Sequence, residues 1–195
     1  MKKIKLFVQA RTYMAVFDAI KKKAGHGLNL KKFVDFLSEE VIKNEHAGSS
    51  EETIFTGSKF FMGAKPTKSL ADETLRYDRL SMEVIWSLGY EMSIIPMYPK
   101  DNDLVDRGVD VDLACDAIRG AALGEFQVAV LFVSDTDYAP LVNHLKKLGV
   151  VTYLVVVDRW GIYTSAVLKR DADVTIEIGE MFDEDEALLN SVLFK

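Results

Sequence analysis

The sequence predicts an α/β fold in which a mostly parallel central sheet lies between two layers of helices, a three-layer αβα sandwich. Apolar segments of strand length alternate with segments of helical spacing along most of the chain, which is typical of parallel strands joined by helices. Two of these segments, 128–133 and 150–157, are almost wholly apolar, as expected of strands covered on both faces. With 195 residues, 49% of them hydrophobic, the chain can bury one substantial core.

The first half of the chain predicts two strands and three helices. Residues 3–8 form an apolar run of strand length, and the segments 12–24 and 29–45 place apolar side chains three and four positions apart, as helices do. Residues 53–62 alternate weakly between apolar and polar types, which favours a strand. Gly89 suits the end of a helix over 70–88.

The second half continues the alternation. Gly124 and Gly149 suit the ends of two helices, and the charged segment 99–108 predicts a loop. The last predicted helix has an acidic first turn, which suits the helix dipole. The predicted elements are strands over 92–98, 128–133, 150–157 and 174–178, and helices over 109–123, 139–148, 162–170 and 183–194.

One domain accounts for this order of elements. We expect it to span residues 1–180, with a helical and loop insertion around 25–88, and a C-terminal helix within 181–195 to follow it. The apolar residues of that helix could pack on the domain's own core or on a second subunit, which would make the protein a homodimer.

Composition narrows the class of protein further. Cys115 is the only cysteine, so no internal disulfide can form, and the three histidines do not show zinc-ligand spacing. The N-terminus lacks the apolar region of a signal peptide, and no apolar stretch approaches the ~20 residues of a membrane span. A cytoplasmic protein without membrane contact is expected. The net charge of −6 argues against passive coating of nucleic acid.

Aspartates gather where two predicted elements meet one edge of the sheet. Asp135 and Asp137 lie just beyond the apolar strand 128–133, and Asp110, with Asp112, lies at the start of the helix 109–123. Asp116 lies one helical turn beyond Asp112. Open α/β sheets bind ligands beyond the carboxyl ends of their strands. Oxygen ligands without His or Cys suit Mg²⁺ or Mn²⁺, so the pattern favours a divalent metal site.

Several longer motifs around these aspartates resemble a known family. The segments VDVDLACDAI, VAVLFVSDTDYAPLVNHLKKLGVVTYLV and SAVLKRDADVTIEI are similar to the NYN domain, a PIN-like family of predicted metal-dependent ribonucleases. The family's middle motif, roughly K-G-V-D-V-x-L-A-x-D, matches the chain from Arg107 to Asp116. Its later motif, roughly S-G-D-S-D-F, matches Asp135, Asp137 and the aromatic Tyr138.

The resemblance implies an endoribonuclease that hydrolyses RNA phosphodiesters with Mg²⁺ or Mn²⁺. The catalytic and metal-binding residues would be Asp110, Asp116, Asp135 and Asp137. RNA is the implied partner. Candidate substrate contacts are Arg11, Thr12, Arg107 and Tyr138, although a packing role for Tyr138 is equally compatible with the sequence.

The first predicted strand departs from the family pattern. Members typically end this strand with aspartate in a D-G-x-N motif, whereas this chain has Gln9, Ala10, Arg11 and Thr12. A neutral amide removes one negative charge, so metal affinity should fall. The remaining aspartates could suffice, catalysis could be lost while binding is kept, or Gln9 could be an introduced substitution.

The sequence leaves three functions open. The first is the metal-dependent endoribonuclease, and the second is a catalytically impaired PIN-like binding or scaffold protein for RNA or a protein partner. The third is a phosphatase with Asp135 as nucleophile. That class needs a long catalytic segment after its D-x-D motif, and only 58 residues follow Asp137.

Overall fold

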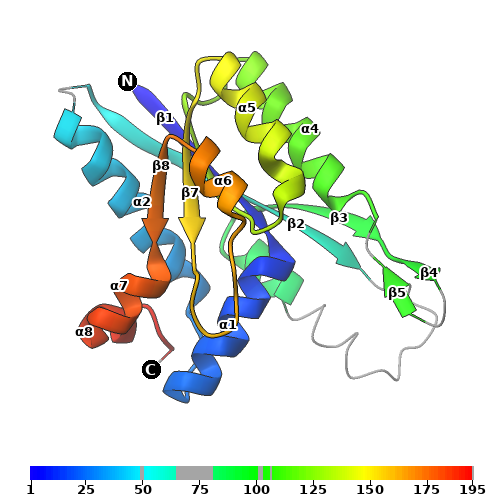
Figure 1. Cartoon of the computed structure of the whole chain (residues 1–195), viewed down its shortest axis with the longest axis vertical. Helices are drawn as coiled ribbons and strands as arrows, with labels where there is room; N and C mark the ends of the chain where they lie inside the picture. Colours follow the sequence, from blue (N-terminus) through cyan, green and yellow to red (C-terminus); the bar gives the residue numbers. More distant parts are fainter. Residues whose placement is uncertain (49–50, 65–80, 101–102, 106, 195) are drawn as a thin grey trace.

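The computed structural model describes residues 1–48, 51–64, 81–100, 103–105 and 107–194. Its centre is a sheet of six parallel strands in the order β3-β2-β1-β6-β7-β8 (Figure 1). The predicted three-layer α/β class is confirmed. The strands of this sheet are β1 (Lys2–Gln9), β2 (Thr53–Ala64), β3 (Glu91–Pro96), β6 (Val128–Phe132), β7 (Val151–Val156) and β8 (Val174–Glu177).

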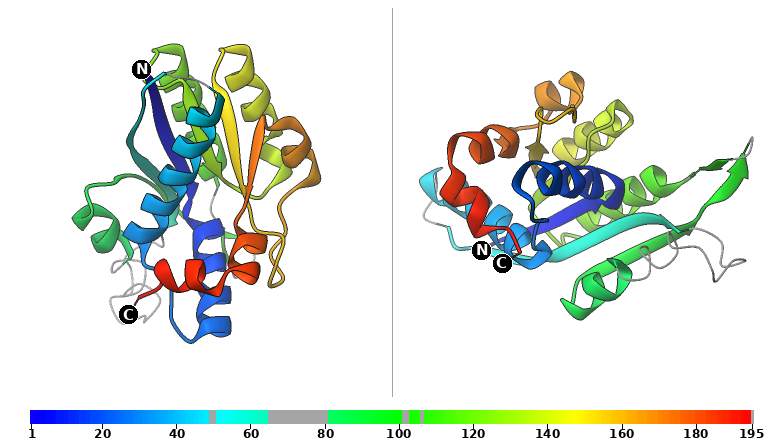
Figure 2. Two further views of the ribbon diagram at one scale, coloured as in Figure 1. Left: turned by 90° about the vertical axis from the view of Figure 1, so that its left-hand side faces the viewer. Right: turned by 90° about the horizontal axis from the view of Figure 1, so that it is seen from below.

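Helices cover both faces of the sheet (Figures 1 and 2). The described helices with complete bounds are α1 (Ala10–Ala24), α2 (Leu30–Gly48), α4 (Val109–Ala122), α5 (Ala139–Lys147), α6 (Ala166–Asp171), α7 (Ile178–Glu184), α8 (Glu186–Ser191) and the 3₁₀ turn η1 (Thr136–Tyr138). Residues 81–87 are also helical, while 70–80 of the predicted helix lie outside the described residues. None of the helices in the described ranges is long and apolar enough to cross a bilayer.

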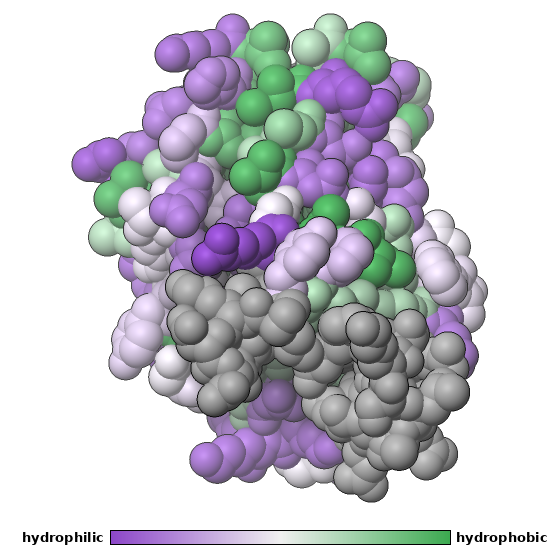
Figure 3. Space-filling model, turned by 90° about the vertical axis from the view of Figure 1, so that its right-hand side faces the viewer, coloured by the Kyte–Doolittle hydropathy of each residue, from purple (hydrophilic) through white to green (hydrophobic). Residues whose placement is uncertain are grey.

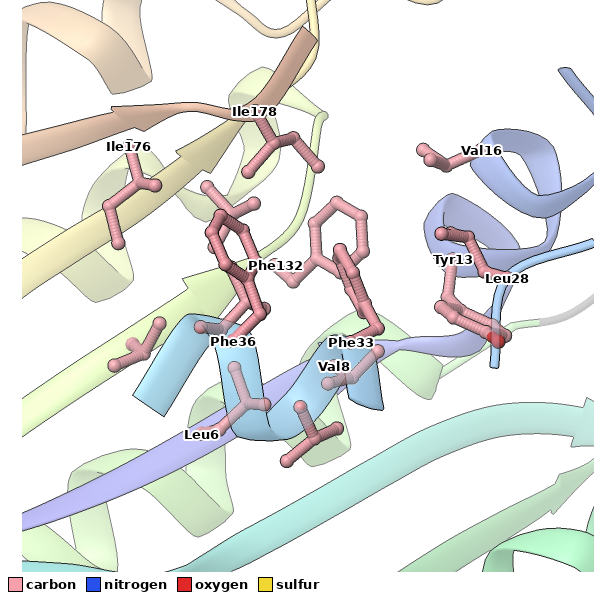
Figure 4. Close-up of a cluster of buried hydrophobic side chains, with 14 of the residues drawn as sticks. Leu6, Val8, Tyr13, Val16, Leu28, Phe33, Phe36, Phe132, Ile176 and Ile178 are labelled. Atoms are coloured by element: carbon pink, nitrogen blue, oxygen red, sulfur yellow. The ribbon is translucent and has the colours of Figure 1, made fainter. Parts of the chain in front are cut away.

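The side chains of each strand alternate between two apolar layers. On one face, Val8 and Phe132 of the central strands meet Tyr13, Phe33 and other residues of α1, α2, α7 and α8 (Figure 4). On the other face, residues such as Leu131 pack against α4, α5 and α6. The space-filling view in Figure 3 shows apolar residues among hydrophilic ones in the upper half, the height at which α4 and α5 lie in Figure 1.

Three local expectations differ from the structure. Residues 162–165 are not helical, because Ser165 caps α6 by accepting the Val167 N–H, and the helix starts only there. The predicted loop 99–108 contains part of a short hairpin, β4 (Tyr98–Lys100) with β5 (Asp103–Val105). The C-terminal helix is broken at Asp185, whose side chain accepts the Leu188 N–H and starts α8.

The segment expected as an insertion supplies core elements. Helix α2 packs on the sheet, and β2 lies between β1 and β3 as a full member of it. The apolar C-terminal residues Leu189, Val192 and Leu193 are at most 4% exposed within the chain's own core. These three residues therefore pack on the chain's own core.

The strand order reverses between β1 and β6. The chain runs outward from β1 through β2 to β3 on one side, and from β6 through β7 to β8 on the other. Val8 and Phe132 are paired, so the carboxyl ends of β1 and β6 lie next to each other. In open α/β sheets this reversal leaves a crevice for a ligand at the carboxyl edge.

Candidate functional site

A buried hydrogen-bond network joins three elements at this reversal. Gln9, the last residue of β1, is 4% exposed, and its Nε2 donates to Asp110 Oδ1 at 2.8 Å. The Tyr138 hydroxyl donates to the same oxygen at 2.6 Å. Thr12, in the first turn of α1, donates its hydroxyl to Gln9 Oε1 at 2.8 Å and lies 3.3 Å from the Ser134 hydroxyl. The half-buried Asp110 carboxylate is thus held by an amide N–H and a phenol O–H.

The local backbone brings Asp110 to this point. Gly108 precedes α4 with φ of 99°, a conformation that residues with a Cβ rarely adopt, and the helix begins directly after it. Asp110 therefore lies in the first turn of α4, where the helix dipole favours a negative charge.

Asp135 and Asp137 lie at the same edge, beyond β6. Both are exposed, and the 3₁₀ turn η1 that carries Asp137 is closed by the Tyr138 N–H donating to the Asp135 carbonyl at 3.2 Å. Neither side chain forms a hydrogen bond or ion pair in the described parts of the structure. These two carboxylates remain open to solvent and to a ligand.

The Asp116 carboxylate does not join the Asp110 network. It forms ion pairs with Lys59 of β2 at 3.1 Å and with Arg119 at 2.6 Å. Six positions separate it from Asp110, which is about 9 Å and more than one and a half turns along a helix. Partial burial opposes ionisation of Asp116, but Arg119 and Lys59 outweigh it and hold the pKa of its carboxyl below the ordinary value. The structure thus does not bring Asp116 to Asp110.

The four predicted substrate contacts differ in exposure. Arg11 and Arg107 are exposed, so both guanidinium groups can reach a ligand. Thr12 is 5% exposed and Tyr138 is 1% exposed. Because the Tyr138 ring is buried and its hydroxyl holds Asp110, the structure favours the packing role for this residue.

A loop between β7 and α6 completes the edge, and its residues did not stand out in the sequence. Asp158 lies two residues after the end of β7, accepts the Thr164 N–H at 2.7 Å and pairs with Lys169. Ser165 donates its N–H to the Ser134 carbonyl at 2.9 Å, and its hydroxyl lies 2.8 Å from that of Thr136. The sequence signal that could have identified Asp158 is an aspartate shortly after an apolar strand, which is the pattern that singled out Asp135.

The Lys169 ion pair predicts a pH dependence. Partial burial opposes ionisation of Asp158, but Lys169 and the Thr164 N–H outweigh it and lower its pKa. A lowered pKa in the folded state stabilises the protein above the unfolded pKa of ~3.9, and this contribution is lost as pH falls through the folded pKa. Lys169→Met should cost about 1 kcal/mol at pH 7 and less below pH ~4, by urea unfolding. Lys147→Met, an exposed control, should change little, and an equal Lys169→Met loss at pH 3 would contradict the assignment.

A parallel α/β sheet with aspartates at the carboxyl edge of its switch point is the architecture expected of a PIN-like nuclease domain. The sequence profile of the NYN domain matches residues 17–179, which is most of the chain. The chain belongs to the NYN domain family, as its motifs predicted. The matched segment begins after Gln9 and Thr12, so the departed first strand lies outside it.

One solved structure shares this fold. The protein of unknown function VPA0982 from Vibrio parahaemolyticus RIMD 2210633 is 17% identical, with a TM-score of 0.64 over 99% of this chain and 96% of that one. The Thermotoga maritima CheB methylesterase catalytic domain is 9% identical, with a TM-score of 0.39 over 97% of each chain. No curated protein matches the sequence.

NYN and PIN-like nucleases generally use divalent metals, so we compared the donors at this edge with the needs of such an ion. Within the described ranges, no three His, Cys, Asp or Glu side chains form a group that could hold a metal. Gln9 and Tyr138 direct an N–H and an O–H at Asp110 Oδ1, so one of the two carboxylate oxygens already faces two donors rather than a cation. As arranged, these residues do not fit a tightly held divalent ion.

Proposed function

We propose that this chain binds single-stranded RNA across the carboxyl edge of its sheet, without a tightly held catalytic metal. The observation that carries the proposal is the Asp110 carboxylate, whose Oδ1 already accepts hydrogen bonds from Gln9 and Tyr138. Hydrogen bonds replace a cation as the partner of this charge. RNA is the expected ligand because nucleases of the NYN family generally act on RNA.

The start of α1 supports phosphate binding at this edge. The helix is 15 residues long, begins directly after Gln9, and has neither an acidic residue in its first turn nor a side-chain cap. Its first backbone N–H groups have no side-chain cap, and the helix dipole favours an anion near them. The exposed guanidinium of Arg11 adds a positive charge in the same turn.

Removing the negative charge of Asp135 or Asp137 should have different effects in an RNA-binding protein and in a metal-dependent nuclease. In a binding site without metal, exposed carboxylates repel RNA phosphates, so removing one charge should leave affinity unchanged or raise it. In a metal-dependent nuclease, the same carboxylates would be ligands, and removing one should abolish activity. Asp135→Asn changes the charge with little change of shape and therefore separates the two.

The test combines fluorescence anisotropy with gel analysis of a labelled single-stranded RNA, in EDTA and in Mn²⁺ or Mg²⁺. We expect binding in both buffers, no cleavage, and unchanged or tighter binding by Asp135→Asn. Arg11→Ala should weaken binding several-fold and lower the slope of log K against log salt by about 1. Lys147→Met is the control for loss of an exposed charge away from this edge. Absence of RNA binding by the wild-type protein would refute the proposal.

A metal-dependent endoribonuclease is the second candidate. It is favoured by the side chains of Asp135 and Asp137, which lack partners among the described residues. Its predicted ligands are Asp110, Asp116, Asp135 and Asp137 with Mg²⁺ or Mn²⁺, and Asp116 would first have to leave Lys59 and Arg119. RNA cleavage that needs metal and is lost in Asp135→Asn would establish this candidate in place of the first.

A further inference from the structure

We propose that Tyr163 is a stacking platform for one base of the bound strand, an inference that rests on the proposed RNA binding. Tyr163 is 78% exposed, more than any other large hydrophobic side chain in the described parts of the chain. It lies in the loop between β7 and α6, on the carboxyl edge of the sheet (Figure 1). An aromatic ring held in solvent beside a phosphate-binding edge is what single-stranded nucleic acid uses for base stacking.

The alternating burial of the loop shows that Tyr163 is held outward. Trp160 and Ile162 are partly buried against the core, and Thr164 is 6% exposed. Gly161 and Tyr163, between them, face solvent.

Hydrogen bonds fix the loop on both sides of Tyr163. Before it, Trp160 Nε1 donates to Asp183 Oδ1 at 3.2 Å, and Lys23 of α1 lies 5.2 Å from the centre of the Trp160 ring. After it, Asp158 accepts the Thr164 N–H. Asp158 and Trp160 have positive φ angles of 39° and 57°, which residues with a Cβ seldom adopt. A ring on a loop held in this way loses little conformational freedom when a base stacks on it.

The loop is tied directly to the acidic turn after β6. Ser165, two residues from Tyr163, donates its N–H to the Ser134 carbonyl and has its hydroxyl 2.8 Å from that of Thr136. Two residues of extended chain span about 7 Å, so the ring can reach only ligands bound close to this turn. The start of α1, the turn after β6 and the loop with Tyr163 all lie at the carboxyl edge of the sheet, so we expect one bound strand to contact all three.

The test measures the affinity of four proteins for a 12-nucleotide oligouridylate and for the same backbone with abasic sites. Tyr163→Ala should weaken oligouridylate binding about tenfold, whereas Tyr163→Phe, which keeps the ring, should stay within about twofold of wild type. Tyr98→Ala removes a tyrosine that is 55% exposed at the far side of the sheet and should have no effect. On the abasic strand, wild type and Tyr163→Ala should bind equally.

The two proposals fail in different ways. Equal oligouridylate binding by wild type and Tyr163→Ala would overturn the stacking role and leave RNA binding intact. A wild-type protein that binds neither strand would overturn RNA binding and stacking together. Because the Tyr163 side chain is exposed, Tyr163→Ala should keep the wild-type urea unfolding midpoint. A tenfold loss that persists equally on the abasic strand would show that the tyrosine does not act through a base.

Discussion

Replacing Gln9 with aspartate is expected to lower the free energy of unfolding by about 2 kcal/mol in metal-free buffer, and millimolar Mn²⁺ should restore most of that loss. The substitution removes the N–H that donates to Asp110 and places a second carboxylate beside it, at a position that is 4% exposed. Two adjacent carboxylates repel each other until a cation intervenes. Bound metal stabilises the folded state by about 2.7 kcal/mol at a hundred times its Kd. Urea unfolding with EDTA or Mn²⁺ measures both effects without an activity assay.

Asparagine at position 9 is the matched control, because it has the length of aspartate and the neutral amide of glutamine. Gln9→Asn should lose part of the stability through its shorter side chain but should not respond to Mn²⁺. The double variant Gln9→Asp with Asp110→Asn should also lose the metal response. If Mn²⁺ stabilises the wild-type protein as strongly as Gln9→Asp, the wild-type edge already holds a metal and our interpretation of Gln9 is wrong.

The prediction of the fold relied on signals that act locally. The apolar runs 128–133 and 150–157 correspond to β6 and β7, because a strand covered on both faces needs apolar residues at every position. The sequence predicts one helix over 162–170, whereas residues 162–165 form a loop that the hydrogen bonds of Asp158 and Ser165 hold in place. Such bonds depend on tertiary position, which helical periodicity does not contain.

The same distinction applies to the site. That Asp110 and Asp135 belong to one edge followed from strand and helix order, since both lie where a parallel sheet meets its connections. The hydrogen-bond and ion-pair partners of the aspartates could not be predicted from that order. Asp116 has the family spacing, yet its direction depends on Lys59, a residue of β2 that the sequence places 57 positions away. The choice of Tyr163 over the buried Tyr138 as an aromatic contact likewise required the exposure of each ring.

Adding one methyl group at Gly179 is expected to cost about 2 kcal/mol of stability. A Cβ at this position in α7 would lie 1.6 Å from the Val157 carbonyl oxygen and 2.7 Å from its carbon, and both are backbone atoms that cannot rotate away. Overpacking of this kind usually costs 1–3 kcal/mol, and the helix preference of alanine over glycine returns at most about 1. Urea unfolding of Gly179→Ala measures the loss.

Gly120→Ala in α4 is the matched control, because its Cβ would meet side-chain atoms of Phe126 and Glu125, at 2.8 and 3.0 Å, rather than backbone. Its cost should be smaller, about 1 kcal/mol. Val157 begins the loop that carries Tyr163, so the clash at Gly179 should also displace this loop. Folded Gly179→Ala protein should then bind oligouridylate more weakly than folded Gly120→Ala protein. Equal stability of the two variants would show that α7 does not pack closely against the Val157 backbone. Equal RNA affinity of the two folded variants would show that the position of this loop does not affect RNA binding.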